Sequence, residues 1–178
     1  MKVRDVMVKD VKVCSPITNL AAAAEILWKK GCGTLPVVEK GRVLGIVTDR
    51  DICIALGTRN VKAADTLVKD VALPKLFYCA PEDDIHAALK TMGAQKVRRL
   101  PVIDNKGTLQ GILCLDEIVL YAKEKAADLT YFDVVETLKA ICGHERPHLA
   151  LAVARGPVEV RGRTAIGGGG GAEVDTVV

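Results

Sequence analysis

The residues best suited to chemistry are a hydroxyl and a carboxylate at the start of a predicted helix. Thr48 and Asp51 are three positions apart, so both side chains lie on one side of the first helical turn. The exposed N–H groups and the dipole of a helix start favour an anion such as phosphate. The same Thr-x-x-Asp pattern is also a helix capping box, worth about 1 kcal/mol without any ligand. An anion-binding site and a helix cap are therefore both possible interpretations, and they are compatible with each other.

A second candidate is the basic run Lys96-Val97-Arg98-Arg99, which leads into an apolar strand. Guanidinium groups make bidentate contacts with phosphate oxygens, which suits Arg98 and Arg99 to anion binding. The alternative is a solvated strand end whose arginines pair with Asp104 or Glu117, an arrangement of little energetic weight.

Other patterns offer less. Cys142, His144 and His148 match no standard zinc spacing, and no fourth ligand is nearby. The glycine run 167–171 lacks the Lys-Ser/Thr pair of a phosphate-binding loop. No nucleophile with a base and an orienting group stands out. We therefore expect a protein without catalytic residues or a bound metal.

Composition excludes several classes of partner. The 178 residues carry 25 Lys+Arg and 22 Asp+Glu, a net charge of +3, and only 3% are aromatic, so we expect no nucleic-acid binding. No apolar run reaches the roughly 18–20 residues of a membrane span, and residues 1–10 lack a secretory apolar stretch. The six cysteines form no C-x-x-C pair and most lie in apolar runs, which predicts buried reduced thiols and a cytoplasmic protein.

The chain repeats itself. Several blocks recur with a constant offset of 65, which becomes 66 after one inserted residue, and this register indicates a duplicated unit. The matching blocks are Arg4-Asp5-Val6-Met7 with Lys69-Asp70-Val71-Ala72, Val13-Cys14-Ser15-Pro16 with Tyr78-Cys79-Ala80-Pro81, Leu35-Pro36-Val37-Val38-Glu39 with Leu100-Pro101-Val102-Ile103-Asp104, and Gly45-Ile46-Val47-Thr48 with Gly111-Ile112-Leu113-Cys114.

Each unit is predicted to have the order β-α-β-β-α, an α/β (α+β) fold that excludes a simple alternating βαβ nucleotide fold. The first unit has a strand at Lys9–Cys14, a helix at Leu20–Lys30, strands at Thr34–Val38 and Val43–Val47 joined by a Lys40-Gly41 turn, and a helix at Thr48–Leu56 closed by Gly57. The second has a strand at Leu76–Cys79, a helix at Asp84–Gly93, strands at Arg99–Ile103 and Leu109–Leu113, and a helix at Leu115–Ala127. An extra amphipathic helix is predicted within Asp128–Cys142, and a largely disordered Gly-rich tail from Gly156 onward.

This pattern resembles the cystathionine-β-synthase (CBS) domain, and two in tandem resemble a CBS pair, or Bateman module. The resemblance rests on Asp-Val-Met near the start, Leu-Pro-Val-Val on the second strand and Gly-Ile-Val-Thr-Asp-Arg-Asp after the third, and it covers residues 1 to about 125. It implies repeats at 1–62 and 63–127, packed about a pseudo-twofold axis with two clefts. Residues 128–155 then form a helical extension and 156–178 a tail. It also implies pairing of two modules into a homodimer.

The resemblance implies an adenosine ligand. Residues 45–51 match the family's binding signature in full, and the pattern assigns the Thr48 hydroxyl to phosphate and the Asp51 carboxylate to the ribose hydroxyls, with Arg50 between them. Hydrogen bonds from hydroxyls to a carboxylate are charge-assisted. The adenine is expected against strand residues of the first repeat, namely Val13, Cys14, Ser15, Gly33, Thr34, Leu35 and Pro36.

The second repeat departs from the signature. Cys114 stands where Ser or Thr is expected and Glu117 where Asp is expected, and a thiol is a poor donor to phosphate. This repeat nevertheless carries Arg98 and Arg99, where members of the family place basic residues against phosphates. We expect a second, weaker site there.

We therefore predict a non-catalytic regulatory module. Its regulatory ligand is AMP, ADP or ATP, with S-adenosylmethionine as a further candidate, and it reports ligand level to an unidentified partner protein. The alternative is a structural or interaction module with vestigial clefts that acts through oligomerisation. An enzyme is the weakest reading, because the repeats occupy most of the chain.

Overall fold

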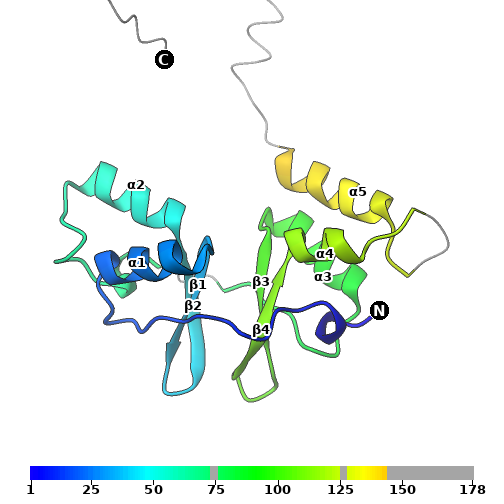
Figure 1. Ribbon diagram of the computed structural model, residues 1–178, viewed down its shortest axis with the longest axis horizontal. Coiled ribbons are helices and arrows are strands. Elements are labelled where there is room, and N and C mark those ends of the chain that lie inside the picture. Colours follow the sequence, from blue (N-terminus) through cyan, green and yellow to red (C-terminus); the bar gives the residue numbers. More distant parts are fainter. Residues whose placement is uncertain (73–75, 125–127, 144–178) are drawn as a thin grey trace, which may run out of the picture. The chain divides into compact units, whose positions relative to one another are not determined.

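A computed structural model describes residues 1–72, 76–124 and 128–143, which lie within one compact unit, Met1–Gly143. Two similar halves lie side by side in it, each with a two-stranded antiparallel sheet and two helices, and the second half has one further helix (Figure 1). The first half contains α1 (Leu20–Lys30), β1 (Thr34–Glu39), β2 (Arg42–Thr48) and α2 (Asp49–Arg59). The second contains α3 (Ile85–Gln95), β3 (Arg99–Ile103), β4 (Leu109–Cys114), α4 (Leu115–Tyr121) and α5 (Tyr131–Cys142). The mixed α+β architecture predicted from the sequence is confirmed.

Local chemistry sets the element ends. The Asn19 side chain accepts a hydrogen bond from the Ala22 amide and caps α1, whose other end stops at left-handed Gly31. The β1–β2 turn has positive φ at Lys40 and Gly41, as a tight hairpin requires. The predicted bounds of α1 and β3 are confirmed residue for residue.

The predicted strands at Lys9–Cys14 and Leu76–Cys79 are wrong. Each is reduced to one parallel bridge, Cys14 with Val37 and Cys79 with Val102. The Cys14 amide donates to the Pro36 carbonyl and the Val38 amide donates to Cys14. The next bonds along this ladder would come from the nitrogens of Pro16 and Pro36, which carry no hydrogen. The second repeat has Pro81 and Pro101 at the same places, so its ladder ends for the same reason.

Three predicted helix ends also differ. Gly57 does not end α2, which continues to Arg59 and stops at left-handed Asn60. Likewise α3 passes Gly93 and stops at left-handed Lys96. The helix predicted to Ala127 ends at Tyr121, because the chain becomes extended at Ala122 and Lys123 bridges to Thr130 ahead of α5.

The two cores exchange the short segments that precede the repeats. The 3-10 turn η1 (Val3–Asp5) lies with the second half, and the chain then crosses to α1 (Figure 1). Val3 and Val6 are buried in the core formed by α3, β3, β4, α4 and α5. The turn η2 (Val68–Asp70) does the reverse, since Val68 and Val71 are buried in the core of the first half. Each core is therefore completed by a segment that precedes the other repeat in the sequence.

The extra helix predicted within 128–142 is confirmed as α5, which packs along α3. Its buried side chains are Val134, Thr137 and Ile141. Near its start, His86 Nε2 of α3 lies 3.6 Å from an Asp133 carboxylate oxygen. Near its end, Lys96 Nζ donates to the Gly143 carbonyl at 2.7 Å. The remainder of the predicted 128–155 extension, the 156–178 tail, His144 and His148 lie outside the described residues.

Candidate functional site between the repeats

Thr48 and Asp51 form the capping box that the sequence allowed. The Asp51 amide donates to Thr48 Oγ1 at 3.1 Å, and the Thr48 amide donates to Asp51 Oδ2 at 3.0 Å. The Thr48 hydroxyl also donates to Asp51 Oδ2 at 2.6 Å. The helix-cap interpretation is confirmed, and both side chains are half-buried.

The cap constrains what this pair can do for a ligand. The single hydroxyl proton of Thr48 is directed at Asp51, so donation to a phosphate requires the hydroxyl to rotate away from the carboxylate. Asp51 Oδ1 accepts no hydrogen bond from the described residues, and so it can accept from the hydroxyls of a ribose. Asp51 is thus prepared for binding, while Thr48 must rearrange.

A cleft of about 380 Å³ lies between the repeats, within the range of small-molecule sites. Three segments form its walls. The N-terminal segment contributes Val8 and Asp10 to Lys12, the α1–β1 loop contributes Lys30 to Thr34, and the second repeat contributes residues from β3, β4 and α4. The Val8 and Ile112 backbones hold the first wall in place, because each amide donates to the other's carbonyl at 2.9 Å.

Five of the predicted site residues line this cleft: Gly33, Thr34, Arg99, Cys114 and Glu117. Thr48 and Asp51 do not line it. Cys14, Leu35 and Pro36 are buried and do not line it either. Val13 is 41% exposed, Ser15 is half-buried, and Arg50 and Arg98 are exposed.

Sequence reasoning missed the N-terminal wall and most of the charged lining. The residues concerned are Val8, Asp10, Val11, Lys12, Lys30, Ile112 and Asp116. The signal available was the recurrence of the block that precedes each repeat, residues 4–7 and 69–72. That recurrence marks the segment as part of the unit without showing that it packs on the other half.

Arg99 crosses the gap between the repeats. Its guanidinium Nη2 lies 3.5 Å from Asp116 Oδ2, so the alternative pairing of Arg99 with Asp104 or Glu117 is wrong. A Cβ at Gly33 would lie 3.4 Å from Asp49 Oδ2 and 3.6 Å from the Arg99 guanidinium nitrogens, which are ordinary contact distances, so Arg99 reaches the α1–β1 loop of the first half. Burial raises the pKa of the neighbouring Cys114 thiol, while the Arg99 charge opposes that shift. The thiol is therefore neutral at pH 7, and a weak donor.

The repeat register predicts a counterpart of this cleft in the other half. Cys114 and Glu117 correspond to Thr48 and Asp51 at the offset of 66. At the offset of 65, the N-terminal wall corresponds to residues 73–77, of which 73–75 lie outside the described residues. The signature pair of the first repeat is therefore the counterpart of groups that line the described cleft.

The six cysteines form no disulfide among the described residues, and burial is confirmed for some of them. Cys14 and Cys79 are buried, and burial raises their pKa values to about 11 and about 12. Cys53 and Cys142 are exposed, which corrects the expectation of uniformly buried thiols. Among the described residues, no group of three or more His, Cys, Asp or Glu side chains could hold a metal ion. Within the same part of the chain, no helix has the length and apolarity of a membrane span.

Comparison with known proteins identifies the repeats. The CBS domain family matches residues 3–58 and 68–124, more than half of the chain. Over 118 residues the chain is 31% identical to the CBS domain-containing protein YhcV of Bacillus subtilis, covering 66% of this chain and 83% of that one. It is 34% identical over 120 residues to inosine-5'-monophosphate dehydrogenase of Methanocaldococcus jannaschii, but these residues span only 23% of that enzyme and 66% of this chain.

Solved structures share the fold. CBSX2 in complex with AMP has a TM-score of 0.60 and 28% identity, over 67% of this chain and 94% of that one. The CBS protein TA0289 of Thermoplasma acidophilum has a TM-score of 0.69 at 19% identity, over 80% and 77% of the two chains. The chain therefore belongs to the CBS domain family and contains two CBS domains in tandem.

Proposed function

We propose that this CBS pair is a non-catalytic regulatory module that binds an adenine nucleotide between its repeats and reports its level to a partner protein. The observation that carries the proposal is the cleft of about 380 Å³, whose walls come from both repeats and from the N-terminal segment. A ligand that contacts both repeats favours the arrangement to which it binds more tightly, and only such differential affinity transmits a signal.

The chemistry of the two clefts supports an adenosine ligand. Val8, Val11 and Ile112 give the described cleft an aliphatic surface for a flat base, and Glu117 gives it a carboxylate for ribose hydroxyls. The counterpart cleft has Asp51, whose Oδ1 is open to the same hydroxyls. CBSX2, which is 28% identical, binds AMP. We extend that ligand class to this chain.

Replacing Asp51 by alanine is expected to weaken nucleotide binding to the counterpart cleft at least tenfold, because the ribose hydroxyls lose a charge-assisted acceptor. Isothermal titration with AMP, ATP and S-adenosylmethionine measures the effect. The substitution also removes a capping residue, at a cost of about 1 kcal/mol of stability. Thr130 and Asp133 form the matching box on α5, with the same hydroxyl-to-carboxylate distance of 2.6 Å, although Asp133 also faces His86.

Asp133→Ala is therefore the control, because it removes a cap outside both clefts. We expect it to lower the melting temperature about as much as Asp51→Ala and to leave nucleotide affinity unchanged. Equal binding by the wild type and Asp51→Ala would remove Asp51 from the site. Wild-type protein that binds none of the three ligands would contradict the proposed function.

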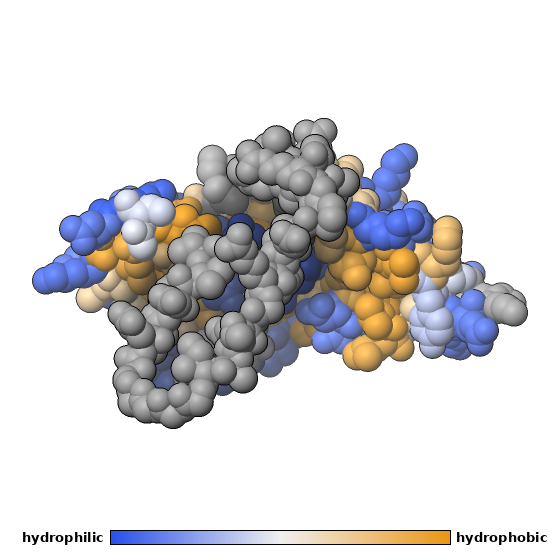
Figure 2. Space-filling model, turned by 90° about the horizontal axis from the view of Figure 1, so that it is seen from above, coloured by the Kyte–Doolittle hydropathy of each residue, from blue (hydrophilic) through white to orange (hydrophobic). Residues whose placement is uncertain are grey.

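A second candidate function, assembly, is favoured by the outer face of α5. Figure 2, which views the side carrying α2 and α5, shows apolar residues gathered on the half that holds α5. Phe132 is 70% exposed, and Tyr131, Val135 and Leu138 are also exposed. Exposed apolar clusters of this kind mark association surfaces. We propose that this face supports the homodimer expected for CBS pairs.

Phe132→Asp is expected to weaken that association at least tenfold, because it places a charge in the apolar face without touching the buried side of α5. Sedimentation velocity over a range of concentrations measures the shift toward monomer. Ile17→Asp is the matched control, since Ile17 is 70% exposed and lies in the other half. A wild-type chain that stays monomeric at all concentrations would exclude this role.

A further inference from the structure

The charges that line the described cleft cancel. Three cations and three carboxylates face it, so its lining has no net charge although the chain as a whole has +3. These six side chains are Asp10, Lys12, Lys30, Arg99, Asp116 and Glu117. An excess of cations favours a tail with several phosphates, because positive charge offsets its negative charge, and this lining offers no such excess.

Most of the positive charge is already engaged. Lys12 Nζ lies 2.7 Å from Asp10 Oδ1, and Arg99 lies 3.5 Å from Asp116. Within the described part of the chain, the side chains of Lys30 and Glu117 make no hydrogen bond or ion pair, although the Lys30 charge contributes to lowering the pKa of Asp10 after the larger effect of Lys12. The cleft thus offers a ligand one uncommitted cation and one uncommitted carboxylate.

The signature position itself adds no phosphate donor. Cys114 presents a neutral thiol where the first repeat has the Thr48 hydroxyl. The apolar wall from Val8, Val11 and Ile112 is independent of ligand charge and suits the base. The lining therefore has two parts. One is an apolar surface that can hold a nucleoside, and the other is a set of charged side chains, with no net charge, around the position of the ligand's tail.

We propose that this cleft selects adenosine ligands whose tail carries no net negative charge, and disfavours nucleoside triphosphates; the inference rests on the proposed function. The carboxylate of an amino-acid tail pairs with Lys30, while Glu117 remains the acceptor for the ribose hydroxyls. A triphosphate instead brings negative charges toward Asp10, Asp116 and Glu117. Adenosine and S-adenosylmethionine then bind more tightly than AMP, and ATP binds most weakly.

Isothermal titration of the full chain with adenosine, S-adenosylmethionine, AMP and ATP tests this order. The same series in Asp51→Ala reports the described cleft alone, because that substitution weakens the counterpart cleft. We expect adenosine and S-adenosylmethionine to bind at least tenfold more tightly than ATP in both proteins at low ionic strength. The difference should narrow as added salt screens the charges.

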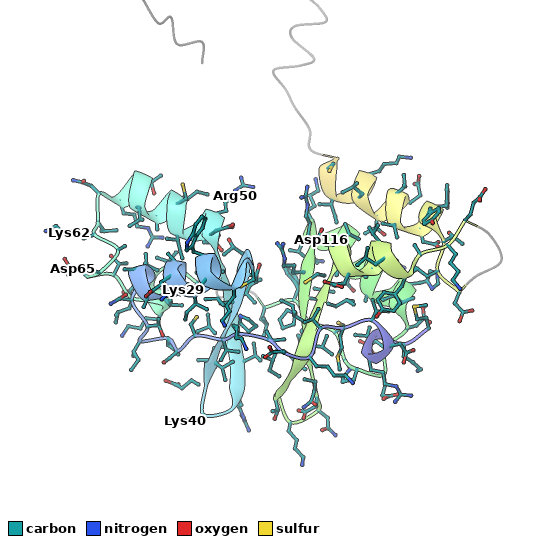
Figure 3. The ribbon with its side chains drawn as sticks, in the orientation of Figure 1. Lys29, Lys40, Arg50, Lys62, Asp65 and Asp116 are labelled. Atoms are coloured by element: carbon teal, nitrogen blue, oxygen red, sulfur yellow. The ribbon has the colours of Figure 1, made fainter. Side chains whose placement is uncertain are left out.

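Asp116→Asn should reduce the preference of the cleft for adenosine over ATP. It removes one carboxylate and releases Arg99, so ATP affinity should rise about tenfold while adenosine affinity stays within twofold. Asp116 lies on the side of α4 that faces the first half (Figure 3). Asp65→Asn is the matched control, because Asp65 is exposed at the outer edge of the first half, away from α4 (Figure 3). The control should change neither affinity.

The outcomes separate the two proposals. ATP that binds as tightly as adenosine in Asp51→Ala, or an ATP affinity that Asp116→Asn leaves unchanged, overturns the charge selection and leaves the proposed function intact. A wild-type chain that binds no adenosine ligand contradicts the proposed function, and the inference falls with it.

Discussion

Val3→Asp is expected to unfold the second CBS domain in preference to the first, although Val3 precedes the first in the sequence. Val3 is fully buried among side chains of the second core, together with Ile85 and Leu113. An aspartate there must bury an unpaired carboxylate or force the segment out, at a cost of about 3–5 kcal/mol. A domain's whole stability is of order 5–15 kcal/mol, so this is a large share.

Amide hydrogen exchange resolves which half opens. Val3→Asp should accelerate exchange in α3, β3 and β4, while Val68→Asp should accelerate it in α1, β1 and β2, because Val68 is fully buried in the first core. Ile17→Asp changes an exposed side chain and should leave both patterns unchanged. Faster exchange in α1 with Val3→Asp, and none in α3, would contradict the exchange of segments between the cores.

The predictions from sequence were most accurate for features that neighbouring residues determine. α1 has an apolar stripe, an Asn cap and a closing Gly31, and each of these can be read from neighbouring residues. The Thr48-x-x-Asp51 cap is equally local. The predictions of a strand before the first helix of each repeat were wrong, because the length of a strand depends on its partner. Prolines in both paired segments end the ladder, although neither segment by itself indicates this.

The candidate site was only half predictable for a similar reason. Gly33, Thr34, Arg99, Cys114 and Glu117 lie at repeat positions that the family pattern marks, and they do line one cleft. Asp10 and Lys12 reach it only because the N-terminal segment crosses to the second half, and Lys30 reaches it from the end of α1. A contact between residues more than 100 positions apart, such as Val8 with Ile112, leaves no periodic signal in the sequence.

Gly111→Ala is expected to destabilise the protein by about 2–3 kcal/mol and to open one wall of the cleft. A Cβ at Gly111 would lie 2.7 Å from the Val8 carbonyl oxygen and 2.9 Å from the Met7 sulfur. The methionine side chain can move, but the carbonyl belongs to the paired hydrogen bonds between Val8 and Ile112. Relieving the clash therefore costs both bonds, each worth about 1 kcal/mol, and loosens the apolar wall.

Gly57→Ala is the control with the opposite sign. Gly57 lies inside α2, and nothing is within 4 Å of where its Cβ would lie, so alanine should stabilise the helix by up to about 1 kcal/mol. Urea unfolding measures both variants, and titration with adenosine shows whether Gly111→Ala also weakens ligand binding. The close approach at Gly111 positions Val8, which lines the cleft. The loss of stability and the loss of adenosine affinity should therefore appear together. A Gly111→Ala protein as stable as Gly57→Ala would mean that the N-terminal segment is not held against β4. In that case the cleft would lack the wall from which both its apolar surface and its Asp10–Lys12 pair derive.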